Sequence, residues 1–322
     1  MFGTMTELAN RRPDDPMLLL GRLDGRLRHS TCSDIFLARS RLHGAAALAG
    51  LAGVSIAVRD LQDWIAGRSP PPRASEGLND PISVASIFHI ALSSDEDARD
   101  PIGRATLKAL RTVLDDRAEA ERYGRDDLAH FGPLWRQVKA AADAPFPSPD
   151  LRSIAERVFA LAEMTEQAPG SASDVVAIDG RSWELPTRSR DRNWLIATAL
   201  PRMLYRAGFT TRAIPSLVLL PKFLPPSPAV LAELFMEEIG RLSTTGLREL
   251  TTIEQSVDRL AHLDVTRRSR TPILARLQIA YPNLRPAAVA KLLGVTPQGA
   301  RKLLASIRNG EKPDGRPTAP SR

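Results

Sequence analysis

The sequence predicts an all-α protein. The expected fold has multi-helical N-terminal and central regions, a C-terminal tri-helical helix-turn-helix domain, and at most one small hairpin near residues 175–185. Two observations support this prediction. Apolar residues recur at the three- and four-residue spacing of a helix face along most of the 322 residues. Most of the 26 prolines stand at the starts of these periodic stretches or between them, where helices tolerate proline.

The first part of the chain predicts three helices, at residues 17–28, 35–51 and 59–66. Together they form an N-terminal helical region, 1–67. The segment 68–81 contains the run PPP, which favours polyproline II and is incompatible with a helix interior. We therefore expect a proline-rich linker there.

Residues 82–266 predict a central helical domain. Asp100-Pro101 and Ser227-Pro228 are typical helix starts, with a capping side chain followed by proline in the first turn. Pro201 predicts a kink or break in its helix. Thr251 and Glu254 have the spacing of a capping box and predict a new helix start. The helices expected here span residues 82–91, 101–123, 126–142, 151–167, 191–206, 229–241 and 253–263.

The most informative stretch is LRPAAVAKLLGVTPQGARKLLASI, residues 284–307. A helix pattern ends at Gly294, which can adopt positive φ without a Cβ penalty. A second helix pattern follows, with Thr296 as N-cap and Pro297 in its first turn. With a preceding helix near 271–280, this pattern predicts a helix-turn-helix domain at 267–309, followed by a disordered tail at 310–322.

The charge of the chain is concentrated beside this motif. Residues 267–322 carry twelve Lys and Arg but only two acidic residues, a net charge of +10, whereas the whole chain has +7. The preceding residues are therefore slightly acidic. Basic charge gathered on one module is expected of a protein that binds a phosphate backbone, although a solvated basic tail is the alternative.

The predicted recognition helix places Gln298, Arg301 and Lys302 on one face, and these three are the candidate base contacts. Gln suits adenine and Arg suits guanine, each through two hydrogen bonds. A second set is better placed for phosphates, either at a helix N-terminus or on a basic arm before the motif. These candidate phosphate contacts are Arg267, Arg268, Arg270, Arg285, Lys291 and Thr296.

The sequence shows no motif for catalysis, cofactors or metals, so we expect no enzyme, no cofactor and no metal site. It lacks a P-loop, a GxGxxG fingerprint and a GxSxG elbow, and the five histidines lack metal-ligand spacing. The single cysteine, Cys32, excludes an intramolecular disulfide and fits a cytoplasmic protein. No apolar run is long enough for a membrane span, and no secretory signal is visible.

Several stretches resemble an uncharacterised alpha-proteobacterial family, often plasmid-borne, that joins a helical domain of unknown function to a C-terminal helix-turn-helix. The resembling pieces are GRLDGRLRHS, ARSRLHGAAALAGLAG, VRDLQDW, ALPRMLYRAGFTTRAIPSLVLLPKFLPP and PNLRPAAVAKLLGVTPQGARKLL. This resemblance implies a DNA-binding regulator. The N-terminal helices are also faintly similar to those preceding the catalytic core of Fic-type proteins, but the HPFxxGN[GK]R loop of those enzymes does not occur here.

The sequence therefore predicts a cytoplasmic, sequence-specific regulator of transcription. It would bind double-stranded DNA, with a homodimer as one option, and would insert helix 297–309 into the major groove. Two other classes stay open: a helical enzyme, or a protein-interaction module, each with an accessory helix-turn-helix.

Overall fold

Many helices of this protein begin at a polar residue followed by proline. The structure is a computed structural model. It describes residues 15–70, 80–93, 100–115, 132–147, 149–166, 174–178, 181–185, 193–260 and 270–310. The helices in these ranges are α1 (Pro16–His29), α2 (Ser33–Leu51), α3 (Val58–Ile65), α4 (Pro81–Ala91), α6 (Pro101–Asp115), α7 (Gly132–Asp143), α8 (Leu151–Thr165), α9 (Asn193–Arg206), α10 (Pro228–Leu260), α11 (Thr271–Ala280), α12 (Pro286–Leu293) and α13 (Pro297–Gly310).

Aspartate side chains cap the starts of several helices. Asp80 accepts a hydrogen bond from the Ser83 amide at 2.8 Å, and Asp100 accepts one from the Gly103 amide at 2.6 Å. In each case the proline that follows the cap lacks an N–H that the helix would leave unsatisfied. The expected start of the helix at Pro101 is therefore confirmed, and its cap is the expected Asp100.

The described strands, β1 (Asp174–Ile178) and β2 (Arg181–Leu185), form one antiparallel hairpin in which Val176 pairs with Trp183. The all-α class with one small hairpin is thus confirmed. The residues between the two strands, 179 and 180, lie outside the described residues.

Two of the expected helix interruptions are absent. Helix α10 runs unbroken from Pro228 to Leu260, so the capping box at Thr251 and Glu254 is wrong as a helix start. The Thr251 hydroxyl donates to the carbonyl of Leu247, four residues earlier, at 2.9 Å, as threonines inside helices do. Glu254 accepts a hydrogen bond from the Ser30 hydroxyl at 2.9 Å. Helix α9 continues past Pro201, so the break that was one of the two outcomes expected there is absent.

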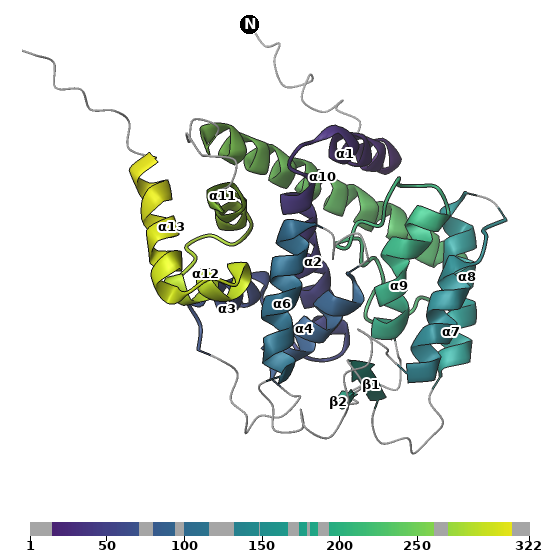
Figure 1. Cartoon of the computed structure of the whole chain (residues 1–322). Coiled ribbons are helices and arrows are strands. Elements are labelled where there is room, and N and C mark those ends of the chain that lie inside the picture. Colours follow the sequence, from purple (N-terminus) through teal and green to yellow (C-terminus); the bar gives the residue numbers. More distant parts are fainter. Residues whose placement is uncertain are drawn as a thin grey trace, which may run out of the picture.

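Helix α2 lies at the centre of the molecule and packs against α4, α3, α6, α9 and α11. Figure 1 shows α7, α8 and α9 on one side of it, and α11, α12 and α13 on the other. The core is continuous across these helices and includes Phe36, Phe88, Phe235 and Tyr281, all at most 1% exposed.

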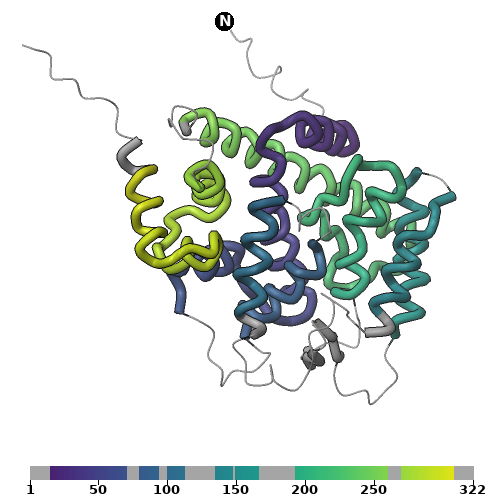
Figure 2. The backbone as a smooth tube through the Cα atoms, viewed as in Figure 1, coloured from purple at the N-terminus to yellow at the C-terminus, as the bar shows by residue number. Residues whose placement is uncertain are grey.

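Helix α1 lies along α10, so the first helix is beside a helix from the last third of the chain (Figure 2). Glycines allow this close approach. A Cβ at Gly240 would lie 3.2 Å from Pro16, and one at Gly246 would lie 2.9 Å from Leu23. Arg26 further along α1 pairs with Glu254 further along α10, which means that the two helices run parallel.

No helix in the described ranges combines the length and the apolar character that crossing a bilayer requires.

Candidate nucleic-acid interface

The turn between α12 and α13 has the geometry that the sequence predicts. Gly294 ends α12 in the left-handed region, at φ 61°. The Thr296 hydroxyl accepts a hydrogen bond from the Gly299 amide at 3.1 Å, which caps the start of α13. A side chain at position 294 would be strained at this φ.

Helix α13 has one buried face and one exposed face. Ala300, Leu304 and Ile307 are at most 5% exposed and pack within the core that α11 and α12 share. The candidate base contacts Gln298, Arg301 and Lys302 are all exposed. The structure thus brings these three together on the solvent face of one helix.

The inner contacts of the helix pair belong to the core of the protein. Val289 on α12 is buried, as are Ala300 and Leu304 on α13. Leu293, Val295 and Leu303 are partly buried at the edge of this core.

The start of α12 lies against the end of α3. The backbone amide of Arg285 donates to the Ala66 carbonyl at 2.9 Å. A Cβ at Gly67, whose φ is +73°, would lie 3.1 Å from the Cβ of Ala288. The amide of the residue that precedes α12 therefore has a protein partner, while the side chain of Arg285 is exposed.

The other candidate phosphate contacts are in different situations. The Lys291 ammonium lies over the ring of Trp64, 5.3 Å from its centroid. A guanidinium nitrogen of Arg270 donates to the Leu293 carbonyl at the end of α12. Thr296 is exposed, and its hydroxyl can still donate while it caps α13. Arg267 and Arg268 lie outside the described residues.

Side chains of α11 and of the residue that follows it form an ion pair and hydrogen bonds with the first half of the chain. Arg276 forms an ion pair with Asp34 at the start of α2, and it also donates to the Thr31 carbonyl at 2.7 Å. The buried Tyr281 hydroxyl is 2.7 Å from that of Thr106 on α6. Burial raises the pKa of Tyr281 to about 12, so this phenol keeps its proton.

The basic side chains of residues 265–310 differ in how far their charge is already paired within the protein. Residues 265–310 contain no acidic residue, yet Arg276 is neutralised by Asp34 and Arg270 is engaged with a carbonyl. Within the described part of the chain, Arg301 and Lys302 make no ion pair. Arg301 and Lys302 therefore keep their charges available on the exposed face of α13.

Two neighbours of the helix pair were not predicted from the sequence, Trp64 on α3 and Lys108 on α6. A Cβ at Gly294 would lie 3.2 Å from the Lys108 ammonium nitrogen, at the turn itself. Local patterns identify the exposed face of α6 but not the segment that it meets, because the contact joins distant parts of the chain.

Across the residues that the structure describes, no group of three His, Cys, Asp or Glu side chains is arranged to hold a metal ion. No protein-family model matches the chain, and a search of the curated proteins found no match.

Proposed function

We propose that this protein is a cytoplasmic, sequence-specific DNA-binding regulator of transcription. The observation that carries the proposal is the exposed face of α13, where Gln298, Arg301 and Lys302 stand together without an acidic neighbour along the helix. A helix of this kind fits the major groove, where its first turns face the base edges. The similarity to helical proteins with a C-terminal helix-turn-helix points in the same direction.

The roles within the interface follow from chemistry. Gln298 suits adenine, and Arg301 suits guanine through two parallel hydrogen bonds. Arg285 and Lys291, with Thr296 at the start of α13, would bind backbone phosphates and fix the register. A homodimer would place two copies of α13 on half-sites about one helical turn apart, ~34 Å, and would double the base contacts.

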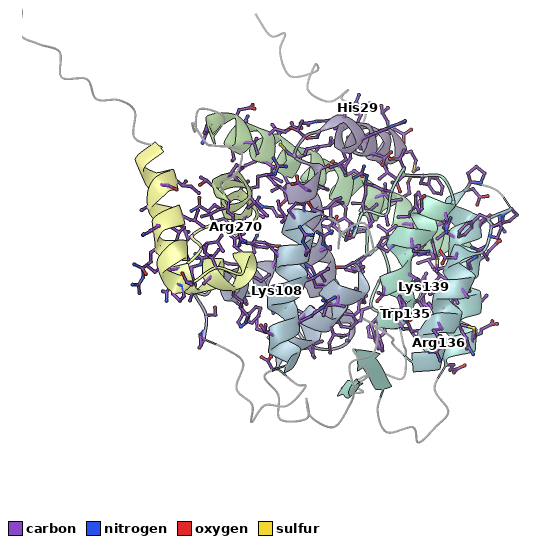
Figure 3. The ribbon with its side chains drawn as sticks, viewed as in Figure 1. His29, Lys108, Trp135, Arg136, Lys139 and Arg270 are labelled. Carbon is purple, nitrogen blue, oxygen red and sulfur yellow. The ribbon has the colours of Figure 1, made fainter. Side chains whose placement is uncertain are left out.

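The test is selection of binding sites from a pool of random duplexes, with the parent protein and Arg301→Ala. We expect the parent to enrich a defined site. The variant should lose preference at one base pair, at a cost of about 1–3 kcal/mol in the free energy of binding to that site. Arg136→Ala on α7 is the matched control, since Arg136 is an exposed arginine at the other end of the molecule (Figure 3).

Two outcomes would contradict the proposal. One is enrichment of the same site to the same degree by Arg301→Ala and the parent. The other is binding of duplex DNA that does not weaken with salt, because release of counterions from the polyanion makes true DNA binding steeply salt-dependent. A protein-interaction module would show neither site selection nor this salt dependence.

A further inference from the structure

Lys108 projects from α6 to the turn between α12 and α13. Its side chain is exposed, and its ammonium nitrogen lies 3.2 Å from the position that a Cβ of Gly294 would occupy. Arg104, one helical turn earlier on α6, is also exposed. Figure 3 shows Lys108 and Arg270 beside the C-terminal helices, and Arg136 and Lys139 at the opposite side of the molecule.

Local structure alone gives Lys108 only a small role. A cation near the C-terminal end of α12 stabilises the helix dipole by about 0.3–1 kcal/mol. Arg270 already supplies a cation there and donates to the Leu293 carbonyl. The Lys108 ammonium, by contrast, has no hydrogen bond or ion pair in the described ranges. Its charge is therefore available to a ligand.

The position of this charge matches that of a phosphate beside the recognition helix. Gly294 is three residues before Pro297, the first residue of α13. Three residues of extended chain span at most about 10–11 Å, and the major groove is about 12 Å wide. If the first turn of α13 enters the groove, Lys108 lies at the groove wall, where the phosphates are.

We propose that Lys108, together with Arg104, binds phosphates of the DNA backbone. This contact comes from α6 and lies outside the helix pair of α12 and α13. This inference rests on the proposed function, because it presupposes that α13 enters the major groove. Its consequence is that the DNA interface includes two segments far apart in the chain. The first half of the molecule then contributes to DNA affinity directly and not only by supporting α11.

The experiment measures the affinity for one selected duplex at several salt concentrations, for the parent, Lys108→Gln, Lys108→Arg and Lys139→Gln. Each phosphate contact contributes about 0.9 to the slope of log K against log salt. We expect Lys108→Gln to reduce the slope by about one. Lys108→Arg should keep the parental slope because it keeps the charge, and Lys139→Gln on α7 should match the parent.

A second measurement does not depend on how any variant folds. The parent protein is treated with an amine-acylating reagent, with and without the duplex, and the modification of each lysine is followed by mass spectrometry. We expect the duplex to slow modification of Lys108 several-fold and to leave Lys139 unchanged.

The outcomes separate the two proposals. If the parent shows no salt-dependent binding to any selected duplex, both fail. If the parent binds and Arg301→Ala loses specificity, but Lys108→Gln keeps the parental slope and Lys108 is not protected, only the contact from α6 is overturned. A lowered thermal midpoint of Lys108→Gln with an unchanged slope would identify a purely structural lysine.

Discussion

His89 on α4 is a titratable side chain enclosed in the core. It is 0% exposed, and neither ring nitrogen has a hydrogen-bond partner among the described residues. Burial lowers the pKa of His89 well below its usual value, and the nearby charge of Arg41 lowers it further. The folded protein therefore holds this imidazole in its neutral form.

This burial predicts a loss of stability in mild acid. The unfolded chain, where a histidine has a pKa of about 6.5, takes up the proton that the folded state refuses. The free energy of unfolding is therefore unaffected by the titration of His89 above about pH 6.5. Below that pH it decreases by up to about 1.4 kcal/mol per pH unit. Urea unfolding between pH 7 and pH 5 measures the effect.

The control is the pair His89→Gln and His29→Gln. The first should remove most of the pH dependence, because glutamine does not titrate, and the second should keep it, because His29 is exposed on α1. Burial raises the pKa of Asp100, so this carboxyl contributes to the pH dependence with the opposite sign to His89. Equal pH dependence in the parent and His89→Gln would refute the assignment.

Single residues that act on their own neighbours were predictable from the sequence. Gly294 and Thr296 shape the turn through local geometry, and both have the expected conformations. The partners of Arg270 and Arg276 were not predictable, because Leu293 lies 23 residues further along the chain and Asp34 lies on another helix. Sequence patterns identify which side chains are charged, but the fold determines which charges remain free.

The packing of helix α2 depends on a glycine, Gly44, which has no side chain. A Cβ at Gly44 would lie 2.2 Å from the Pro215 carbonyl oxygen and 2.7 Å from a methyl carbon of Leu92. Ser40, one turn earlier, accepts a hydrogen bond from the Ser216 amide at 2.9 Å. The segment after α9 thus passes directly over this face of the helix.

Gly44→Ala is expected to destabilise the protein, because backbone atoms must move to admit the methyl group. Overpacking of this kind typically costs about 1–3 kcal/mol or more. Gly50→Ala is the matched control in the same helix, since a Cβ there meets nothing within 4 Å. That change should stabilise by about 0.5–1 kcal/mol through helix propensity. The midpoints of urea unfolding compare the two, and equal midpoints would contradict the close approach.

The length of α10 shows where prediction of elements from sequence ends. The same pattern of Thr and Glu three residues apart can occur at the start of a helix and inside a helix. Here Thr251 donates back to its own helix, and Glu254 accepts hydrogen bonds from Arg26 of α1 and from Ser30, which directly follows α1. A neighbouring helix supplies the hydrogen bonds that a cap would otherwise make, and that neighbour cannot be read from the local sequence.

At the scale of the molecule, the C-terminal helices are packed against the first half of the chain. Helix α11 contacts α2, α6 and α10, and α12 contacts α6. The boundaries of a separate domain at 267–309 stay a prediction. The observed contacts favour a different behaviour, in which these helices unfold together with the central ones.

Native-state hydrogen exchange tests this cooperativity. We expect amides of α11 to exchange with the same opening free energy as those of α2, because the buried contacts between them must break together. Arg276→Gln, which removes the pair with Asp34, should lower both values. Arg241→Gln is the control, because its partner Glu238 lies on the same helix. Exchange of α11, α12 and α13 at a lower free energy of their own would instead indicate a separate domain.

The pairing of α11 with α2 also has a consequence for synthesis of the chain on the ribosome. The surface that receives Arg276 is made with Asp34, but the helix that covers it is made 242 residues later. Contacts so distant in sequence form late and slow folding. A chain terminated before α11 would leave apolar surface of α2 and α6 uncovered and prone to aggregation. Under the proposed function, only a finished polypeptide can bind DNA.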